Sequence, residues 1–379
     1  MSVESGRPLR ILHLGFEDPL MPGAGGGSVR THEINRRLVR SGMQVTVLTT
    51  CYPGSTERVQ DGVRYVPVGV GAGRTRLSRL VGYTGLLPLA VRSRPDHDLV
   101  VEDFFAPISS MAAPLWTGRP TIGVVQWLHA RDKAAEYGVP FHLVEHRAVR
   151  THHTLISVSE GTSERLRAMN PAAHVEVIGN GVDRLAFDQP HRTGRDLVFI
   201  GRLEIRGKGL DLLLQAWAMA CPKLDADLIV AGTGPDEAAL RRLAERLGVA
   251  HRVRFAGWVS GAAKYELLSS ARLAVVPSRH ETFGIVAVEA LASGTPVVAF
   301  DIPCLRELLS PDVAHVVPAF DVQAFAGELV SRYHATAQLQ EMGRRGRSTA
   351  RAFDWDTLAA RQAEVYEAAA RRGSLSRGR

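Results

Sequence analysis

Hydrophobic residues along the first half of the chain come in short runs, separated by longer amphipathic stretches. Within the runs the apolar residues are continuous rather than alternating with polar ones, as in strands buried on both faces of a sheet. Strands that alternate with helices predict a parallel sheet in an α/β fold. Strands are predicted at residues 9–16, 44–50, 63–68, 99–102, 121–125, 155–158 and 175–178, and the first helix at 28–41.

The pattern stops after residue 178 and then restarts. Residues 183–195 contain a proline, a glycine and several charges, and we interpret them as a linker between domains. Beyond them, strands are predicted at 197–200, 228–231, 253–255, 273–277 and 296–300, and helices at 210–220, 237–247, 262–270, 285–293 and 355–371. The pattern therefore predicts two Rossmann-like domains, whose sites lie where strands end. Their expected bounds are 1–183 and 184–350, followed by a C-terminal helical segment at 351–379.

Charge and cysteine content narrow the choice of partners and compartment. The net charge is +7, but the arginines are spread along the chain and no basic block is interleaved with aromatic residues. We therefore expect no nucleic-acid partner. Cys51, Cys221 and Cys304 lie far apart, and residues 1–8 lack the apolar run of a signal peptide. We expect a cytoplasmic protein, with peripheral contact at the inner membrane face left open.

The strongest chemical signal is the segment Glu-Thr-Phe-Gly-Ile at residues 281–285, with a second glutamate at 289. Gly284 lets the backbone turn tightly and approach a ligand. The helix that begins at Ile285 directs its free N–H groups at this place, which suits a diphosphate. Glu281 and Glu289 are suited to sugar hydroxyls. The alternative is a helix-start acid and a surface charge, but Glu289 lies in an apolar run where an unpaired charge is unfavourable.

A second signal follows the predicted strand at 197–200 and reads Gly-Arg-Leu-Glu-Ile-Arg-Gly-Lys-Gly. Arg202 and Lys208 supply cations at the carboxyl end of a strand, where a diphosphate leaving group could bind. The segment is not a P-loop of an NTPase, because its first two glycines are one residue too far apart. Gly209 also stands where a P-loop needs Ser or Thr.

Together these segments resemble the retaining GT-B glycosyltransferases of family 4, also called glycosyl transferases group 1. The hallmark of that family is a pair of glutamates separated by seven residues, matched by Glu281 and Glu289. A Gly-Arg-Leu…Lys-Gly segment is matched by Gly201, Arg202 and Lys208. Many relatives have one residue fewer between the arginine and the lysine.

The resemblance implies two domains facing a cleft, with the acceptor bound by the N-terminal domain and the nucleotide-sugar by the C-terminal one. The last helix would cross back to the N-terminal domain. Arg202 and Lys208 would bind the diphosphate, with Arg206 as a substitute for either cation. Glu281 would hold the sugar and Glu289 the ribose. The other donor-binding positions are Gly25, Gly26, Gly27, Trp258, Val259, Phe283, Gly284, Ile285 and Val286.

Two features of the N-terminal half belong to the same interpretation. The glycine-rich loop 23–27 does not fit a dinucleotide fingerprint, which would need glycine at Ser28. The resemblance places this loop over the diphosphate and near the acceptor; a purely structural loop is the alternative. His129 would contact the donor sugar near the reacting carbon, unless it is structural. With Glu281, Arg202 and Lys208 it completes the predicted catalytic set.

Three further patterns have mainly structural interpretations. Ser159 is expected to cap the helix that begins near residue 161. His142-Leu-Val-Glu-His146 matches a zinc-peptidase pattern, but no third ligand is evident, and we expect a polar helix face and no metal. The apolar residues 81–91 are flanked by arginines. We expect them to cover the first domain; docking on anionic lipid, as in relatives with lipid acceptors, is the alternative.

We therefore predict a retaining glycosyltransferase that uses a nucleotide-sugar, with UDP-sugars as the default donor, and that needs no cofactor. The alternatives are a nucleotide-sugar epimerase on the same fold and a non-catalytic nucleotide-sugar sensor. The residues leave the sugar, the acceptor (a small molecule, a saccharide or a lipid) and the oligomeric state open.

Overall fold

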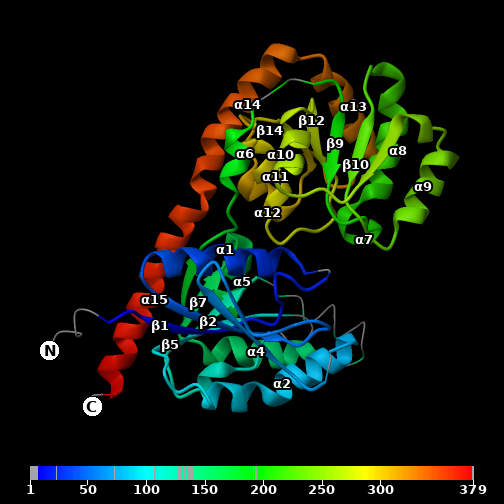
Figure 1. Cartoon of the computed structure of the whole chain (residues 1–379). Coiled ribbons are helices and arrows are strands. Elements are labelled where there is room, and N and C mark those ends of the chain that lie inside the picture. The colour runs from blue at the N-terminus through cyan, green and yellow to red at the C-terminus, as the bar shows by residue number, and fades with distance from the viewer. Residues whose placement is uncertain are drawn as a thin grey trace. The chain divides into compact units, whose positions relative to one another are not determined.

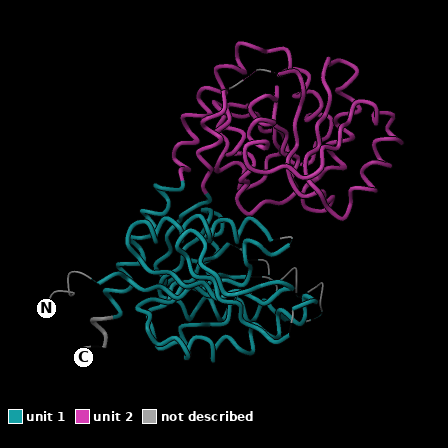
Figure 2. Tube along the Cα trace, viewed as in Figure 1, with its two compact units in different colours: residues 1–180, 355–379 teal, residues 181–354 magenta. Residues whose placement is uncertain are grey.

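The computed structural model describes residues 7–377 except 23, 72, 106, 107, 109, 127, 129, 131–133, 135–137, 139, 191 and 193. The chain forms two compact units (Figure 2). Unit 1 comprises Met1–Asn180 together with Trp355–Arg379, and unit 2 comprises Gly181–Asp354.

Unit 1 is built on an eight-stranded sheet with the order β3-β4-β2-β1-β5-β6-β7-β8 (Figure 1). All neighbouring strands are parallel except β3 and β4, which form an antiparallel hairpin at one edge. The strands are β1 Arg10–Leu14, β2 Gln44–Thr50, β3 Arg58–Gln60, β4 Val63–Val68, β5 Leu99–Asp103, β6 Thr121–Val125, β7 Thr154–Ser157 and β8 His174–Val177. The helices are α1 Gly26–Arg40, α2 Arg76–Arg92, η1 Ala113–Leu115, α4 Phe141–Thr151, α5 Glu160–Met169 and α15 Trp355–Arg377.

Both faces of this sheet are covered, which explains why its strands are apolar without alternation. Successive residues of a strand point to opposite faces. Ile11 of β1 packs in one cluster with α1 and α15, whereas Leu12 and Leu14 pack in another with α2. The two helices α1 and α15, far apart in sequence, therefore lie together on one face.

Helix α2 covers the other face of the sheet, as the sequence predicts for residues 81–91. Its Tyr83 and Leu87 are buried, and the phenol of Tyr83 donates a hydrogen bond to the carbonyl of Leu48 at 3.2 Å. The outer side of the helix carries exposed apolar side chains, among them Leu77 and Val81. Within the described part of the chain, no helix is both long enough and apolar enough to cross a bilayer.

Unit 2 contains a six-stranded parallel sheet with the order β11-β10-β9-β12-β13-β14. The strands are β9 Leu197–Ile200, β10 Leu228–Ala231, β11 Val253–Gly257, β12 Leu273–Val276, β13 Val297–Phe300 and β14 Ala314–Val317. The helices are α6 Arg184–Asp188, α7 Ile205–Lys208, α8 Leu210–Ala220, η2 Cys221–Lys223, α9 Glu237–Arg246, η3 Ala250–Arg252, α10 Gly261–Ser269, α11 Ile285–Ala292, α12 Pro303–Leu308, α13 Val322–Tyr333, α14 Thr336–Ala350 and η4 Arg351–Phe353.

The chain winds in opposite directions from the middle of this sheet. It passes from β9 outward to β10 and β11, then returns to β12 and continues to β13 and β14. Because crossovers between parallel strands are right-handed, α8 and α9 cover one face, and α10 and α11 the other. The direction reverses between the neighbouring strands β9 and β12, which is where such sheets bind ligands.

Two expectations about unit 2 are wrong. The supposed linker 183–195 begins inside the unit, because α6 lies in it and packs against α10 and α11. Val182 also bridges to Asp354, and the Arg347 guanidinium donates to the carbonyls of Phe187 and Gln189 at 2.6 Å each. The sheet does not end at β13 either, since β14, α13 and α14 follow it before α15.

Candidate active site

The candidate site lies at the switch point of the unit 2 sheet, in the two loops that follow β9 and β12. The strands are neighbours, so their carboxyl ends meet at one edge. The loop after β9 contains the predicted cations, and the loop after β12 contains the first motif glutamate. The fold therefore brings together two motifs that lie about 70 residues apart in the sequence.

The loop after β9 contains a single helical turn, α7. The Glu204 carboxylate caps it by accepting the Gly207 N–H at 3.2 Å. Gly209 ends it with a φ of +63°, and a Cβ there would lie 2.0 Å from the Pro277 carbonyl oxygen. Lys208, at the end of this turn, is thereby directed towards the loop after β12.

The two loops are also joined by Arg279. Its guanidinium forms a bidentate pair with Asp211, at 2.6 and 2.8 Å, and donates to the Ile205 carbonyl at 2.9 Å. The backbone N–H groups of Arg279 and His280 both donate to the Gly207 carbonyl. Burial works to raise the pKa of Asp211, but the hydrogen bonds and charge of Arg279 outweigh it and hold that pKa below its ordinary value.

Glu281 is the point where the loops meet. Its Oε1 accepts from the Lys208 ammonium at 2.5 Å and from the Ser278 hydroxyl at 2.7 Å. Burial, reinforced by the charge of Glu281, raises the pKa of the neighbouring Cys304 thiol to about 12, so this thiol stays protonated at neutral pH. Arg202 and Arg206 are exposed, and neither side chain pairs with another described residue.

Gly284 shapes the start of α11. It has a φ of +84°, and a Cβ would lie 2.5 Å from a methyl carbon of Leu305, so glycine is required twice over. No side chain caps the helix, whose first residues, Ile285 and Val286, are half-buried. Phe283 packs edge-on against Phe353 with 5.9 Å between ring centroids, so its side chain belongs to the core.

Glu289 lies inside α11 and is 5% exposed. Its Oε1 accepts from the Lys264 ammonium at 2.5 Å and from the Tyr265 phenol at 3.3 Å. Glu289 therefore has the partners that the sequence argument requires. They are two residues of α10 that the sequence did not indicate. Trp258, at the carboxyl end of β11, is 73% exposed, and Val259 is half-buried.

The glycine-rich segment of unit 1 follows β1, which pairs with β5 at the switch point of that sheet. Helix α1 begins at Gly26, so Gly26 and Gly27 form its first turn, although the sequence predicts a start at Ser28. Gly25 donates its N–H to the Glu17 carboxylate at 3.0 Å. The start of α1 has no side-chain cap.

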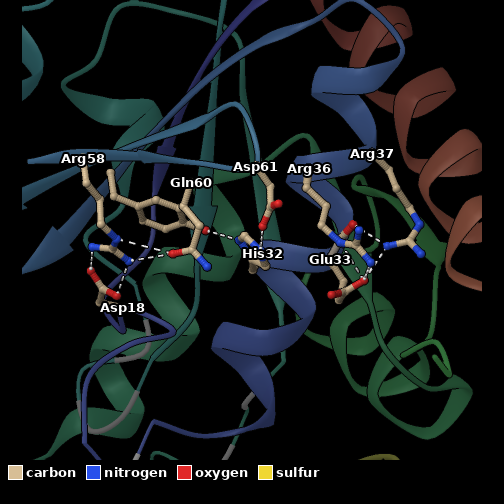
Figure 3. A network of polar contacts seen from close by, with 9 residues as sticks. Asp18, His32, Glu33, Arg36, Arg37, Arg58, Gln60 and Asp61 are labelled. Carbon is tan, nitrogen blue, oxygen red and sulfur yellow. Dashed lines mark hydrogen bonds and ion pairs between the residues drawn. The ribbon is translucent and has the colours of Figure 1, made fainter. Parts of the chain in front are cut away.

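A polar network attaches both sides of this glycine-rich segment to the β3–β4 hairpin (Figure 3). Before it, the buried Asp18 accepts two hydrogen bonds from the Arg58 guanidinium, both at 2.7 Å. After it, His32 of α1 bonds to the Asp61 carboxylate at 3.0 Å and the Tyr65 phenol at 2.8 Å. None of these residues was singled out from the sequence, because the hairpin partner strand β3 was not predicted.

The remaining predicted residues lie elsewhere in unit 1. His129 lies outside the described residues. His142 and His146 are on α4, where Glu145 between them is buried and accepts the Ala130 N–H at 3.2 Å. Over the residues that the structure describes, no group of three or more His, Cys, Asp or Glu side chains could hold a metal ion. Ser159 caps α5, as predicted, by accepting the N–H of Thr162 at 3.4 Å.

Known proteins are similar to this chain in both sequence and fold. The family Glycosyl transferases group 1 matches residues 181–349, and Glycosyltransferase Family 4 matches residues 24–184. A phosphatidyl-myo-inositol mannosyltransferase of Mycobacterium leprae is 37% identical over 187 residues, which are 48% of this chain and only 49% of that protein. An MMP alpha-(1->4)-mannosyltransferase of Mycolicibacterium hassiacum is 30% identical over 76% of this chain and 68% of its own length.

Among solved structures, the Anabaena protein HepE, in complex with UDP-glucose, matches with a TM-score of 0.75 at 18% identity. The match covers 95% of this chain and 100% of HepE. The family matches cover both units, and each unit has the parallel sheet that this fold requires. The chain therefore belongs to glycosyltransferase family 4 and has the GT-B fold.

Proposed function

We propose that the chain transfers a sugar from a nucleotide-sugar donor to a hydroxyl or similar group of an acceptor, with retention at the anomeric carbon. The observation that carries this proposal is the contact of Lys208 with Glu281 at the switch point of unit 2. A cation suited to a diphosphate lies beside a carboxylate suited to sugar hydroxyls. A nucleotide-sugar joins a diphosphate to a sugar, and the bond between these two groups is the one that breaks.

In this proposal Arg202 and Lys208 stabilise the negative charge that builds on the leaving diphosphate. The N–H groups at the start of α11, after Gly284, contribute to the same end. Because these groups replace the divalent metal that other glycosyltransferases use, the reaction needs no metal or other cofactor. Arg202 supports the assignment, because an exposed guanidinium without a described partner is available to a ligand.

Other parts of the donor have proposed contacts of their own. Glu281 holds the sugar hydroxyls, Glu289 holds the ribose, and Trp258 with Val259 contacts the base. His129 remains a predicted contact of the reacting carbon. The acceptor oxygen attacks that carbon on the face from which the diphosphate departs, and its proton passes to the leaving phosphate oxygen.

UDP-glucose and UDP-mannose are the first donors to test, followed by GDP-mannose and ADP-glucose. The Anabaena neighbour is in complex with UDP-glucose, and the two relatives named above are mannosyltransferases, so both sugars belong in the panel. A ligand that binds the folded state raises the melting temperature by mass action. We expect one nucleotide-sugar, and its nucleoside diphosphate, to raise the melting temperature more than the others.

Product analysis then tests the reaction class. A transferase releases nucleoside diphosphate and forms a glycoside only when an acceptor is present, and NMR of the anomeric proton shows whether configuration is retained. An epimerase would convert the donor sugar without an acceptor. A sensor would bind the donor and leave it intact. Either outcome would replace the proposal, although family membership favours neither.

One surface feature favours a lipid among the acceptor classes. Leu77, Val81 and Leu89 are exposed apolar side chains of α2, and the exposed Arg76 and Arg92 lie at the ends of the helix. Such a surface suits an anionic bilayer. Co-sedimentation with vesicles of anionic phospholipid that is lost when Leu77 and Val81 are both replaced by serine would support a membrane acceptor. Unchanged partition of wild type and variant would favour a water-soluble one.

A further inference from the structure

The two motif glutamates are held in the same way, each by one lysine and one hydroxyl group. In each carboxylate a single oxygen, Oε1, accepts from one lysine ammonium and one hydroxyl. The donors are Lys208 and Ser278 for Glu281, and Lys264 and Tyr265 for Glu289. The second oxygen of each glutamate has no partner among the described residues.

Two buried carboxylates of unit 1, Asp18 and Glu102, are bound differently. Asp18 accepts through both oxygens, from the Arg58 guanidinium and from the backbone N–H of Leu20. Glu102 also uses both oxygens, and its three donors belong to the backbone of Met111, the backbone of Ala113 and the His152 ring. Binding through one oxygen thus separates the two motif glutamates from Asp18 and Glu102. The buried Asp103 resembles the motif glutamates in this respect, because Thr31 donates to its Oδ2 while its Oδ1 has no hydrogen-bond partner among the described residues.

The geometry has a direct consequence for a ligand. Two donors on one oxygen remove the rotational freedom of the carboxylate and leave the other oxygen in a defined place. An acceptor that is already oriented binds a hydroxyl without a further loss of side-chain entropy. The lysine lowers the cost of keeping the charge at low exposure, and the neutral hydroxyl sets the orientation.

We infer that Ser278 and Tyr265 are positioning residues for the donor, each holding one oxygen of a motif glutamate so that the other is presented to a donor hydroxyl. The inference rests on the proposed function, in which Glu281 binds the sugar and Glu289 the ribose. Ser278 is 1% exposed and Tyr265 is 4% exposed, so neither hydroxyl is available for general solvent contact.

Tyr265 is well suited to this task. Burial, together with the charge of Glu289, raises the pKa of its phenol above the ordinary value, so it remains a hydrogen-bond donor throughout the neutral range. The Lys264 ammonium lies 4.6 Å from the centre of the Tyr265 ring, which adds a cation–π contact between the two donors of Glu289.

The test removes one hydroxyl at a time. With UDP-glucose as the first donor and UDP as the bare nucleotide, Ser278→Ala should lower kcat by about 3- to 10-fold and leave the UDP affinity near wild type, as expected for one hydrogen bond. Tyr265→Phe should weaken UDP by a similar factor of about 3 to 10 and leave kcat at saturating donor nearly unchanged. Ser278→Thr, which restores a hydroxyl, should recover most of the lost kcat.

Matched controls separate positioning from a structural role. Tyr333 donates its phenol to the Asp225 carbonyl at 2.6 Å, and Ser269 donates to the Glu266 carbonyl at 3.1 Å, both within unit 2. Tyr333→Phe and Ser269→Ala should alter the melting temperature at most. The inference is overturned if Ser278→Ala and Tyr265→Phe change kcat and UDP affinity together, or if they change only the melting temperature. If Glu281→Gln itself leaves turnover intact, the proposed role of Glu281 fails instead.

Discussion

The two sheets of the chain have the same plan, but Asp18 and Glu102 of unit 1 are bound differently from Glu281 and Glu289 of unit 2. Each reverses direction between two neighbouring parallel strands, β1 and β5 in unit 1 and β9 and β12 in unit 2. In unit 1 the carboxylates of Asp18 and Glu102 are bound by the chain on both oxygens. In unit 2, Glu281 and Glu289 are bound on one.

Under the proposed function, this difference distinguishes polar groups that hold the chain from polar groups that bind the donor. A buried carboxylate with both oxygens engaged has little capacity left for a ligand, and its loss leaves its donors without an acceptor. A carboxylate bound through one oxygen has its other oxygen fixed in orientation and able to accept a hydrogen bond from a ligand. In unit 1 the paired charges fix the loops around the glycine-rich segment; in unit 2, under the proposed function, the same chemistry orients two carboxylates for the donor.

The largest expected effect is on stability, in unit 1. Glu102→Ala leaves the N–H groups of Met111 and Ala113 and the His152 ring without their acceptor, in a place where Glu102 is 1% exposed. We expect the free energy of unfolding to fall by about 3–5 kcal/mol. Urea titration followed by tryptophan fluorescence measures it. Glu281→Ala is the control and should cost under about 1 kcal/mol. Equal losses would remove the distinction between the units.

The next effect is on nucleotide binding, in unit 2. Lys208→Ala and Arg202→Ala should each weaken nucleoside-diphosphate binding by about 1.5–3 kcal/mol, the range for hydrogen bonds to charged groups. Isothermal titration calorimetry with UDP and GDP gives the affinities. Arg206→Ala is the matched control, since it is an exposed arginine of the same loop. If Arg206→Ala has the effect and Arg202→Ala does not, the longer spacing of this loop has exchanged the two cations.

Glutamine replacements sharpen the comparison within unit 2. Glu281→Gln keeps the side-chain size and should leave bare nucleotide binding near wild type, while turnover falls about 10-fold or more, since about 1.4 kcal/mol of lost transition-state contact suffices. Glu289→Gln should weaken the bare nucleotide instead, because its proposed partner is the ribose. Calorimetry and steady-state kinetics on both variants decide the assignment, and the reverse pattern would exchange the two roles.

A smaller effect is expected for Asp211, which is partly exposed. The pKa of its carboxyl is lower in the folded chain than in the unfolded one, because the bonds from Arg279 outweigh burial. Its contribution, up to about 1 kcal/mol, is therefore present at neutral pH and lost as the pH falls through the folded-state pKa. The melting temperatures of wild type and Asp211→Asn should differ at pH 7 and converge in acid. A gap that widens in acid contradicts the sign.

The last prediction is that removal of metal ions has no effect on the rate of transfer. If Arg202 and Lys208 replace a metal, exhaustive chelation should leave the rate of transfer unchanged. Activity lost on chelation and restored by magnesium would argue against that role. Restoration by zinc alone would bring back the histidines at 142 and 146 as ligands. The same assay on Lys208→Ala, with and without added magnesium, asks whether a metal can take over from the missing cation.

Strand positions could be predicted from the sequence because each strand is a short run of apolar residues. The bounds predicted for β2, β4 and β6 match the structure to the residue. The start of α1 was misplaced because Gly26 and Gly27 look like loop residues. The first-turn N–H groups of a helix have no intrahelical partner, so glycine is tolerated there. The strand β14 was not predicted because His315 interrupts the short apolar run of Ala314–Val317.

Only part of the candidate site could be predicted from the sequence, for a related reason. The motif residues Glu281 and Glu289 follow from chemistry and spacing along the chain. Lys264 and Tyr265 do not, because nothing in a periodic pattern says which helix packs beside α11. Arg279 lies next to the motif in sequence, yet its hydrogen bonds to Ile205 and Asp211 depend on how β12 packs beside β9. Partners across a fold are fixed by tertiary packing, which local patterns do not contain.

The position of α15 has a consequence for the order in which the protein is made. Arg30, fully buried in α1, donates to the Gln362 side chain at 2.9 Å, and Gln362 in turn donates to the Tyr366 phenol at 2.6 Å. Unit 1 therefore takes part of its core from residues that are synthesised after all of unit 2, whereas unit 2 is one continuous segment. During synthesis unit 2 has all of its residues first, and unit 1 cannot complete its core until α15 has been made.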